Sequence, residues 1–316
     1  MISDRLTRFE KILADLPVPV RSLLADLPEQ GGKLDHNTCL ALTSHLNMSW
    51  EQLMLRLLPL AGIFAQVPIS GFAVGAVVLT ESRSASIERE LYLGANLEFE
   101  GQTLNATIHA EQSAAVNAWH QGGGRLLAVA TSETPCGHCR QFLHEFYGGK
   151  NLFVIQTGHQ VDEYRIEPIA KLLPQAFTPT DLDKPITLMA PKQSVRLLKL
   201  KDKSDDPLVA SALKAATLAY APYTGNLAGC ALKILNGRTV SGCSLESVAF
   251  NPSVSALHAA VIRMNLMTLS KSQVVERAVF VERPTKICQQ ESVQMLMKTV
   301  MPDIMLEYHL AQEEKE

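Results

Sequence analysis

Four residues in the middle of the chain have the types and the spacing of a catalytic metal site. His109 and Glu111 lie two apart in IHAEQSAAVN, and Cys136 and Cys139 lie three apart in TPCGHC. Two thiolates and one imidazole provide three zinc ligands, and a zinc site with three protein ligands keeps a fourth position open for water. The pattern therefore predicts a catalytic zinc bound by His109, Cys136 and Cys139.

Glu111 is expected to transfer protons rather than to bind the metal. Positions two apart on a regular helix face different ways, so Glu111 is poorly placed to be a fourth ligand beside His109. It can instead accept a proton from the zinc-bound water, because zinc lowers the pKa of that water toward neutrality. The residues together predict hydrolytic attack at an electrophilic carbon.

The segments around these residues alternate between helix and strand patterns. A helix is expected over about 109–121, followed by the strand RLLAVATS and a helix that opens at Cys136, where free backbone N–H groups favour thiolate. Before them, GFAVGAVVL and ELYLGANLE are expected to form a hairpin, and NLFVIQTG follows as a further strand. The order predicts an α/β fold with a mixed sheet covered on both faces.

From about residue 205 the same order repeats. Glycines recur at matched offsets, which indicates matched turns and backbone approaches: Gly71 with Gly225, Gly75 with Gly229, and Gly94 with Gly242. Asn236-Gly237 between two apolar runs predicts a second hairpin. LHAAVIRMNL, at 257–266, resembles IHAEQSAAVN and aligns His109 with His258 and Glu111 with Ala260. Cys288 has no second cysteine three residues away. The second copy is therefore expected to be a former active site that has lost its catalytic residues and serves as a scaffold.

This repeat divides the chain of 316 residues into four expected parts. A helical segment covers 1–48, a catalytic domain 49–190, a charge-rich linker 191–204 and a degenerate copy of the domain 205–316. The length is sufficient for two sizeable cores.

Composition narrows the classes of partner. Hydrophobic residues make up 47% of the chain and the net charge is −3, which argues against a nucleic acid or an anionic membrane and favours a small, roughly neutral ligand. The amphipathic N-terminal segment has no apolar signal-peptide region, so a cytoplasmic location is expected.

The six cysteines are too sparse for a disulfide framework, and those outside the motif are expected to be buried apolar side chains: Cys39, Cys230, Cys243 and Cys288.

The combination H-x-E followed by P-C-x-x-C is the signature of zinc deaminases that act on cytosine and adenine. Through GFAVGA, GANLEF, HAEQSA, TPCGHCRQF and LLPQAF, the chain resembles the cytidine deaminases, and more closely the large dimeric bacterial type with a degenerate second domain. The resemblance implies a three-layer α/β/α fold present twice. It also implies zinc-dependent conversion of cytidine and 2′-deoxycytidine to uridine and 2′-deoxyuridine, with release of ammonia, in pyrimidine salvage.

Asn96 and Glu98 are candidates for binding the sugar. An amide and a carboxylate suit a ribose diol, and the carboxylate would repel a 3′-phosphate; a capping Asn and an ion-paired Glu are the structural alternatives. The resemblance implies the same sugar-binding role, with Leu97 contributing backbone at most. It further implies that Phe72 neighbours the pyrimidine and that Phe177 reaches the site of a neighbouring subunit, so that a homodimer completes each site.

Three other functions share part of this pattern. A polynucleotide deaminase would need basic grooves and stacking aromatics, whereas aromatic residues make up only 6% of this chain. A nucleotide-specific enzyme would need a basic phosphate clamp where Glu98 stands, and a zinc-binding scaffold would leave Glu111 incidental. Of the other histidines, the resemblance implies that His138 is not a ligand, and His120 and His144 are expected to be packing or surface residues.

The retired second site predicts one zinc per chain. Metal analysis of the purified protein should return one equivalent, because only the first copy has an imidazole and two thiolates to bind it. Two equivalents would contradict the interpretation of the second copy as a scaffold.

Overall fold

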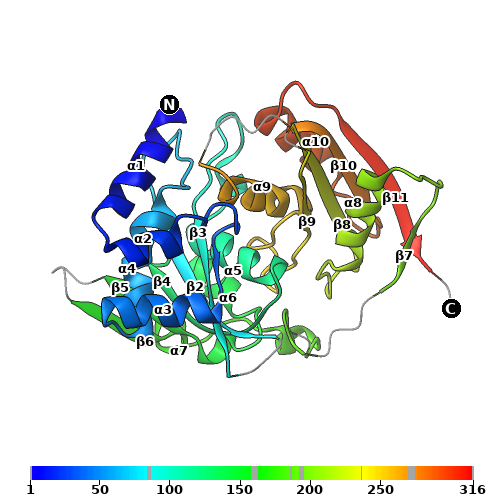
Figure 1. Ribbon diagram of the computed structural model, residues 1–316. Coiled ribbons are helices and arrows are strands. Elements are labelled where there is room, and N and C mark those ends of the chain that lie inside the picture. The colour runs from blue at the N-terminus through cyan, green and yellow to red at the C-terminus, as the bar shows by residue number, and fades with distance from the viewer. Residues whose placement is uncertain are drawn as a thin grey trace.

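The computed structural model describes residues 2–83, 87–157, 163–185, 187–191, 196–235, 237–269 and 275–314. Figure 1 shows two β-sheets with helices between them and on their outer faces. Asn236 of the expected hairpin turn lies outside the described residues. Its neighbour Gly237 has a φ of +81°, the left-handed region that favours glycine.

The described residues form the following helices: α1 (Ile2–Ala14), α2 (Val18–Leu24), α3 (His36–Leu46), α4 (Trp50–Gly62), α5 (Ala110–His120), α6 (Gly137–Leu143), α7 (Ile169–Leu172), α8 (Pro207–Thr217), α9 (Ala256–Leu266) and α10 (Gln290–Val300). The strands are β1 (Lys33–Leu34), β2 (Gly75–Ser82), β3 (Arg89–Ala95), β4 (Gly123–Thr131), β5 (Phe153–Thr157), β6 (Tyr164–Pro168), β7 (Leu198–Leu200), β8 (Ala228–Ile234), β9 (Thr239–Cys243), β10 (Val275–Glu282) and β11 (Leu306–Glu313). We call the sheet β1–β6 with α1–α7 the first lobe, and β7–β11 with α8–α10 the second lobe.

Four strands of each sheet share one topology: β3-β2-β4-β5 in the first sheet corresponds to β9-β8-β10-β11 in the second. The first has the strand order β1-β3-β2-β4-β5-β6 and the second β7-β11-β10-β8-β9. In the first, β2 is antiparallel to β3 and β4, and β4 is parallel to β5. In the second, β8 is antiparallel to β9 and β10, and β10 is parallel to β11. Each lobe is thus a mixed α/β unit, and the repeated fold expected from the sequence is confirmed.

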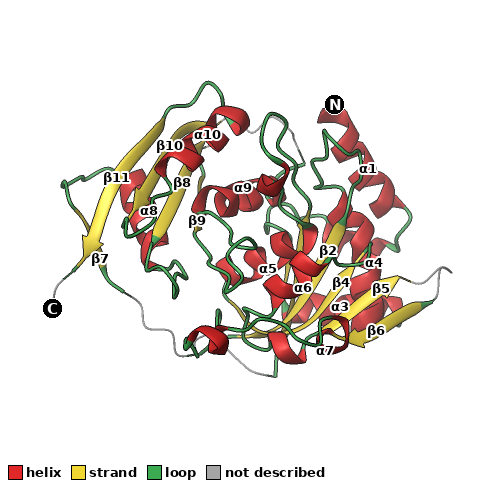
Figure 2. Ribbon diagram, turned by 180° about the vertical axis from the view of Figure 1, so that it is seen from behind, coloured by secondary structure: helices red, strands yellow, loops and turns green. Residues whose placement is uncertain are grey.

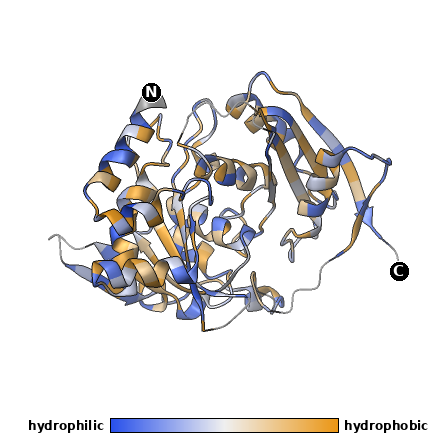
Figure 3. Cartoon of the chain, in the orientation of Figure 1, coloured by the Kyte–Doolittle hydropathy of each residue, from blue (hydrophilic) through white to orange (hydrophobic). Residues whose placement is uncertain are grey.

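The helices form layers on the two sheets. Residues of α1, α2, α3 and α4 pack on the outer face of the first sheet, and α8 covers the outer face of the second. Between the sheets, α5, α6, α9 and α10 contribute to one continuous buried core (Figures 1 and 2). Figure 3 shows hydrophobic residues concentrated on the central strands and the helix faces against them. Among the described helices, none is long and apolar enough to span a membrane.

Two glycines permit equivalent close contacts between a helix and a sheet in the two lobes. A Cβ atom at Gly94 of β3 would lie 2.1 Å from the backbone N of Ala114 in α5. A Cβ atom at Gly242 of β9 would lie 2.2 Å from the backbone N of Ala260 in α9. The contacts are equivalent, so Ala114 corresponds to Ala260, and α5 and α9 hold equivalent places on their sheets.

This equivalence corrects the sequence alignment of the two copies. His109 is the N-cap residue of α5, and its counterpart at α9 is Ser255, so Leu257 stands where the first lobe has Glu111. The pairing of His109 with His258 was wrong by three residues, because both helices repeat small and apolar residues at helical spacing. The second lobe therefore lacks the histidine ligand as well as the carboxylate. His258 packs edge-on against Phe99 of the first lobe, with ring centroids 5.4 Å apart.

Two further expectations need correction. The segment 1–48 is not helical throughout, because Lys33 and Leu34 pair with Tyr92 and Leu91 and extend the first sheet at its edge. Cys288 is exposed, whereas Cys39, Cys230 and Cys243 are buried as expected.

The contact at Gly242 predicts that the second lobe tolerates no side chain there. Gly242→Ala should lower the free energy of unfolding by at least about 3 kcal/mol, because the new methyl group meets helix backbone that cannot move independently. Chemical denaturation measures the change. Gly62→Ala, at the end of α4, is the control: its Cβ would have 4.0 Å of clearance, and it should be neutral or mildly stabilising. Equal effects of the two substitutions would contradict the packing argument.

Candidate active site

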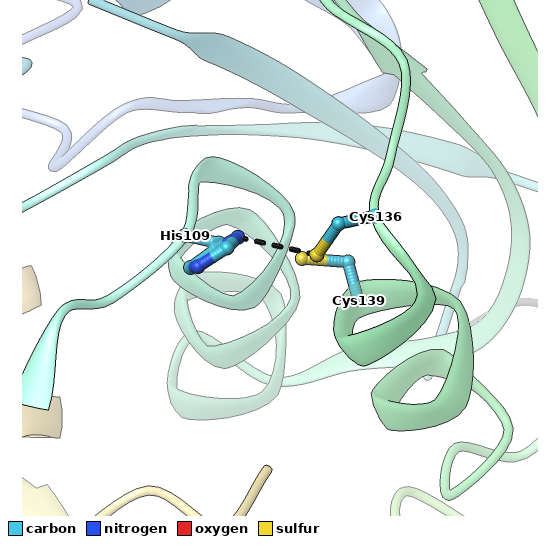
Figure 4. Close-up of side chains that lie close together, drawn as sticks. All are labelled: His109, Cys136 and Cys139. Carbon is cyan, nitrogen blue, oxygen red and sulfur yellow. Dashed lines mark hydrogen bonds between the residues drawn. The ribbon is translucent and has the colours of Figure 1, made fainter. Parts of the chain in front are cut away.

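The amino ends of two helices bring the expected metal ligands together. His109 is the N-cap residue of α5, Cys136 is the N-cap residue of α6, and Cys139 lies in the first turn of α6. Figure 4 shows the three side chains facing one another. The first turn of a helix has unpaired backbone N–H groups and the positive end of the helix dipole, which favour thiolates.

The donor atoms have the separations that zinc requires. His109 Nδ1 and Cys136 Sγ are 3.5 Å apart, and the ligand atoms of His109, Cys136 and Cys139 all lie within 4.8 Å of one another. Tetrahedral zinc with one nitrogen and one sulfur ligand places these atoms roughly 3.5 Å apart. Cys139 is buried and Cys136 is exposed, so the cluster is open on one side. The residues fit a zinc ion with an accessible fourth position.

Hydrogen bonds within the cluster shift the pKa values of the two cysteines in opposite directions. Bonds from Cys139 and His109 lower the pKa of the Cys136 thiol to about 3. The bond to Cys136, together with burial, raises the pKa of Cys139 well above its usual value. The contact with Cys136 also raises the pKa of His109. These shifts favour the thiolate form at Cys136, and Cys139 would lose its proton on binding a cation.

Glu111 lies next to the Cys139 thiol and is almost completely buried, with 5% of its surface exposed. Burial raises the pKa of its carboxyl group, and hydrogen bonding to the Cys139 thiol opposes that shift. A raised pKa makes a carboxylate a stronger proton acceptor, as proton transfer requires. The geometry thus suits the expected role in proton transfer.

The Asn96 side chain holds the loop before β2. Its Oδ1 accepts a hydrogen bond from the backbone N of Val74 at 2.9 Å, and its Nδ2 donates to the carbonyl oxygen of Phe72 at 2.9 Å. The side chain is buried, at 9% exposure. Asn96 therefore fixes the backbone on both sides of residue 73, and its contact with a sugar stays a prediction.

Glu98 clamps the preceding part of the same loop. Its Oε2 accepts hydrogen bonds from the backbone N atoms of residues 69–70, at 2.9 and 3.0 Å. Burial raises the pKa of Glu98, but the bonds from this loop outweigh it and lower the pKa overall. In the second lobe, Glu246 accepts equivalent bonds from residues 223–224, at 2.9 and 3.1 Å. Because the lobe without zinc ligands retains the clamp, the clamp is a property of the fold, and the role of Glu98 toward a sugar stays a prediction.

The remaining candidates differ in exposure. Phe72 and Phe177 are exposed, at 56% and 41%. Gln141 of α6 binds the backbone of Phe177 on both sides, accepting from its N at 3.1 Å and donating to its O at 2.6 Å. Leu97 has a buried side chain, and its backbone N–H and C=O both pair with Ile108.

Sequence reasoning missed the residue that fixes the start of α5. Gln112 Oε1 accepts a hydrogen bond from the backbone N of His109 at 3.1 Å, and its Nε2 donates to the carbonyl oxygen of Pro252 in the second lobe at 3.1 Å. A Gln three residues after a helix N-cap is half of a capping box, a signal that was present in the sequence. His138 stacks against His109, with ring centroids 5.5 Å apart; His120 is half-buried and His144 is buried.

Comparison with known proteins agrees with this geometry. The model of the cytidine and deoxycytidylate deaminase zinc-binding region matches residues 48–155 and again residues 169–295. The cytidine deaminase of Photobacterium profundum is 36% identical over 86% of this chain and 86% of its own length. That of Aliivibrio fischeri is 34% identical over 95% of this chain and 97% of its own length. The chain therefore belongs to the cytidine and deoxycytidylate deaminase family, with two deaminase-like α/β units and a zinc-binding site in the first.

Proposed function

We propose that this protein is a zinc-dependent cytidine deaminase that hydrolyses cytidine and 2′-deoxycytidine to uridine and 2′-deoxyuridine, with release of ammonia. The observation that carries the proposal is the buried Glu111 carboxyl group next to His109, Cys136 and Cys139. This arrangement combines a three-ligand metal site with a carboxyl group that can exchange protons. The similarity to cytidine deaminases over most of the chain supports the same reaction.

The proposed mechanism assigns the proton transfers to Glu111. His109, Cys136 and Cys139 would hold the zinc ion, which would supply Lewis acidity toward the attacking water. Glu111 takes the proton of the attacking water and delivers it to ring N3 of cytosine as the oxygen adds to C4. It then takes the remaining proton from the oxygen added at C4 and passes it to the 4-amino group, so that the C4–N bond breaks, ammonia departs and the C4 carbonyl group forms. Because the carboxyl group is buried, the proton stays between Glu111 and the base instead of exchanging with solvent.

The substrate we propose is a free nucleoside, with no nucleic acid or membrane as partner. The loop held by Asn96 and Glu98 supports this, because a lowered pKa keeps the Glu98 carboxylate charged and therefore repulsive toward a phosphate beside it. The net charge of −3 also disfavours a polynucleotide. A role in cytoplasmic pyrimidine salvage belongs to the same proposal.

We further propose that the active form is a homodimer. Phe72 and Phe177 support it, since both are large apolar side chains that the single chain leaves exposed. In the proposed dimer, Phe177 of one subunit covers the base at the site of the other.

Substitution of Glu111 tests the proton-transfer role. Glu111→Gln keeps the shape of the side chain but cannot accept a proton, so zinc should remain near one equivalent while kcat falls at least about 100-fold. Metal analysis and the absorbance change of cytidine hydrolysis measure the two quantities. Cys136→Ala is the matched comparison and should lose zinc and activity together. Full activity of Glu111→Gln would contradict the mechanism.

Mixing two inactive variants tests the shared site. If Phe177 acts across the dimer, a heterodimer of Phe177→Ala and Glu111→Ala contains one site with both an intact Glu111 and an intact Phe177. Activity should then recover toward that of one site per dimer after unfolding and refolding of the mixture. An active monomer on gel filtration, or a mixture with only the summed activity of its parts, would refute the shared site.

A further inference from the structure

A buried carboxylate connects the end of the metal-binding helix to the second lobe. Glu145, two residues after α6 ends, is completely buried. Its Oε1 accepts hydrogen bonds from the hydroxyl groups of Tyr220, at 2.7 Å, and Tyr223, and its Oε2 accepts one from the backbone N of Val248 at 2.8 Å. All three donors belong to the second lobe.

The three hydrogen-bond donors offset the free-energy cost of burying the Glu145 carboxylate. Removing a carboxylate from water is costly unless hydrogen bonds replace those to solvent. Burial raises the pKa of Glu145, and the bonds from Tyr223, Tyr220 and Val248 oppose that shift. If the lobes moved apart by more than a hydrogen bond allows, the carboxylate would lose these partners, so the contact restricts their relative position.

The two tyrosine donors come from the second lobe's counterpart of the proposed substrate loop. The backbone N of Tyr220 donates to Ser244 O at 3.0 Å, just as that of Gln66 donates to Asn96 O at 3.0 Å in the first lobe. Tyr220 and Tyr223 therefore stand in the loop that corresponds to the segment clamped by Asn96 and Glu98. Where the first lobe is proposed to bind a sugar, the second lobe binds a carboxylate of the first.

Glu145 is attached to the end of α6, the helix that carries two of the zinc ligands. Its backbone N donates to Phe142 O of α6 at 3.1 Å, and Phe142 is buried against Phe146, with ring centroids 5.3 Å apart. The other ligand-bearing helix, α5, is also attached to the second lobe, because Gln112 Nε2 donates to Pro252 O. Each of the two helices that hold the zinc ligands thus has its own hydrogen-bonded attachment to the second lobe.

We propose that Glu145 is a positioning residue: through Tyr220, Tyr223 and Val248, the second lobe fixes α6 relative to α5 and so sets the separation of the zinc ligands. The degenerate lobe thereby acts on the metal site without contacting it. Only the kinetic part of the following test rests on the proposed deaminase function.

The experiment compares zinc retention in the native protein and in the variants Glu145→Gln and Tyr220→Phe/Tyr223→Phe. In Glu145→Gln the new amide N–H faces one of the three hydrogen-bond donors, so that hydrogen bond is lost. The tyrosine double variant removes both hydroxyl groups that donate to the carboxylate. We expect zinc to pass to a chelator about tenfold faster in both, and kcat for cytidine to fall more than KM changes. The single variant Tyr223→Phe, which retains Tyr220, should give an intermediate rate and serves if the double variant does not fold.

Tyr308→Phe is the matched control. The Tyr308 hydroxyl donates to the buried carboxylate of Glu282 at 2.9 Å, but both residues lie in the second lobe. This variant loses the same kind of bond, so it should lose stability while its rate of zinc loss and its kcat stay native. Hydrogen exchange should increase at 137–147 in the Glu145 and Tyr220/Tyr223 variants and not in the control.

The outcomes separate the two proposals. Native rates of zinc loss in the Glu145 and tyrosine variants, measured on folded protein, would overturn the positioning role. So would equally faster zinc loss in Tyr308→Phe, because stability alone would then explain it. If the native protein did not act on cytidine, zinc loss and hydrogen exchange would still decide whether Glu145 positions α6.

Discussion

The close contact between α5 and strand β3 is the constraint on which the site depends. Gly94 has no side chain, so the helix backbone reaches the strand at a distance that any Cβ atom would prevent. That contact positions the start of α5, where His109 is the N-cap residue and Glu111 the second residue of the helix. One ligand and the proton-transfer group thus take their positions from sheet packing. The second lobe repeats the contact at Gly242 after losing the chemistry, so its function there is structural.

Burial and helix ends together account for the electrostatics of the site. The thiolate of Cys136 is stabilised by hydrogen bonds at the start of α6, while Glu111 is kept from solvent within the core. The core that surrounds Glu111 is shared, because apolar side chains of both lobes pack between the two sheets. A second lobe without ligands therefore still contributes to the low-polarity surroundings that the carboxyl group requires.

Much of the fold was predictable from local pattern. The helix that opens at Cys136, the hairpin of β2 and β3, and the repeated order of elements follow from apolar periodicity and turn residues. Strand β1 was missed, because two residues have no measurable period and are ordered only by pairing with β3. The alignment of His258 with His109 was wrong for a different reason. Two helices of similar composition can be aligned equally well after a shift of about one turn, and the packing of α9 against Gly242 shows which alignment is correct.

The sequence by itself determined the chemistry: His109, Glu111, Cys136 and Cys139 have the types and spacing of a zinc deaminase site, and the P-C-x-x-C motif places both thiols at a helix start. Tertiary structure decided how that chemistry is held. It showed that Glu98 clamps a loop as Glu246 does, and that Gln112 and Glu145 attach the two metal-binding helices to the second lobe. The Gln112 and Glu145 contacts join residues more than 70 positions apart, and local periodicity has no information about pairs at that distance.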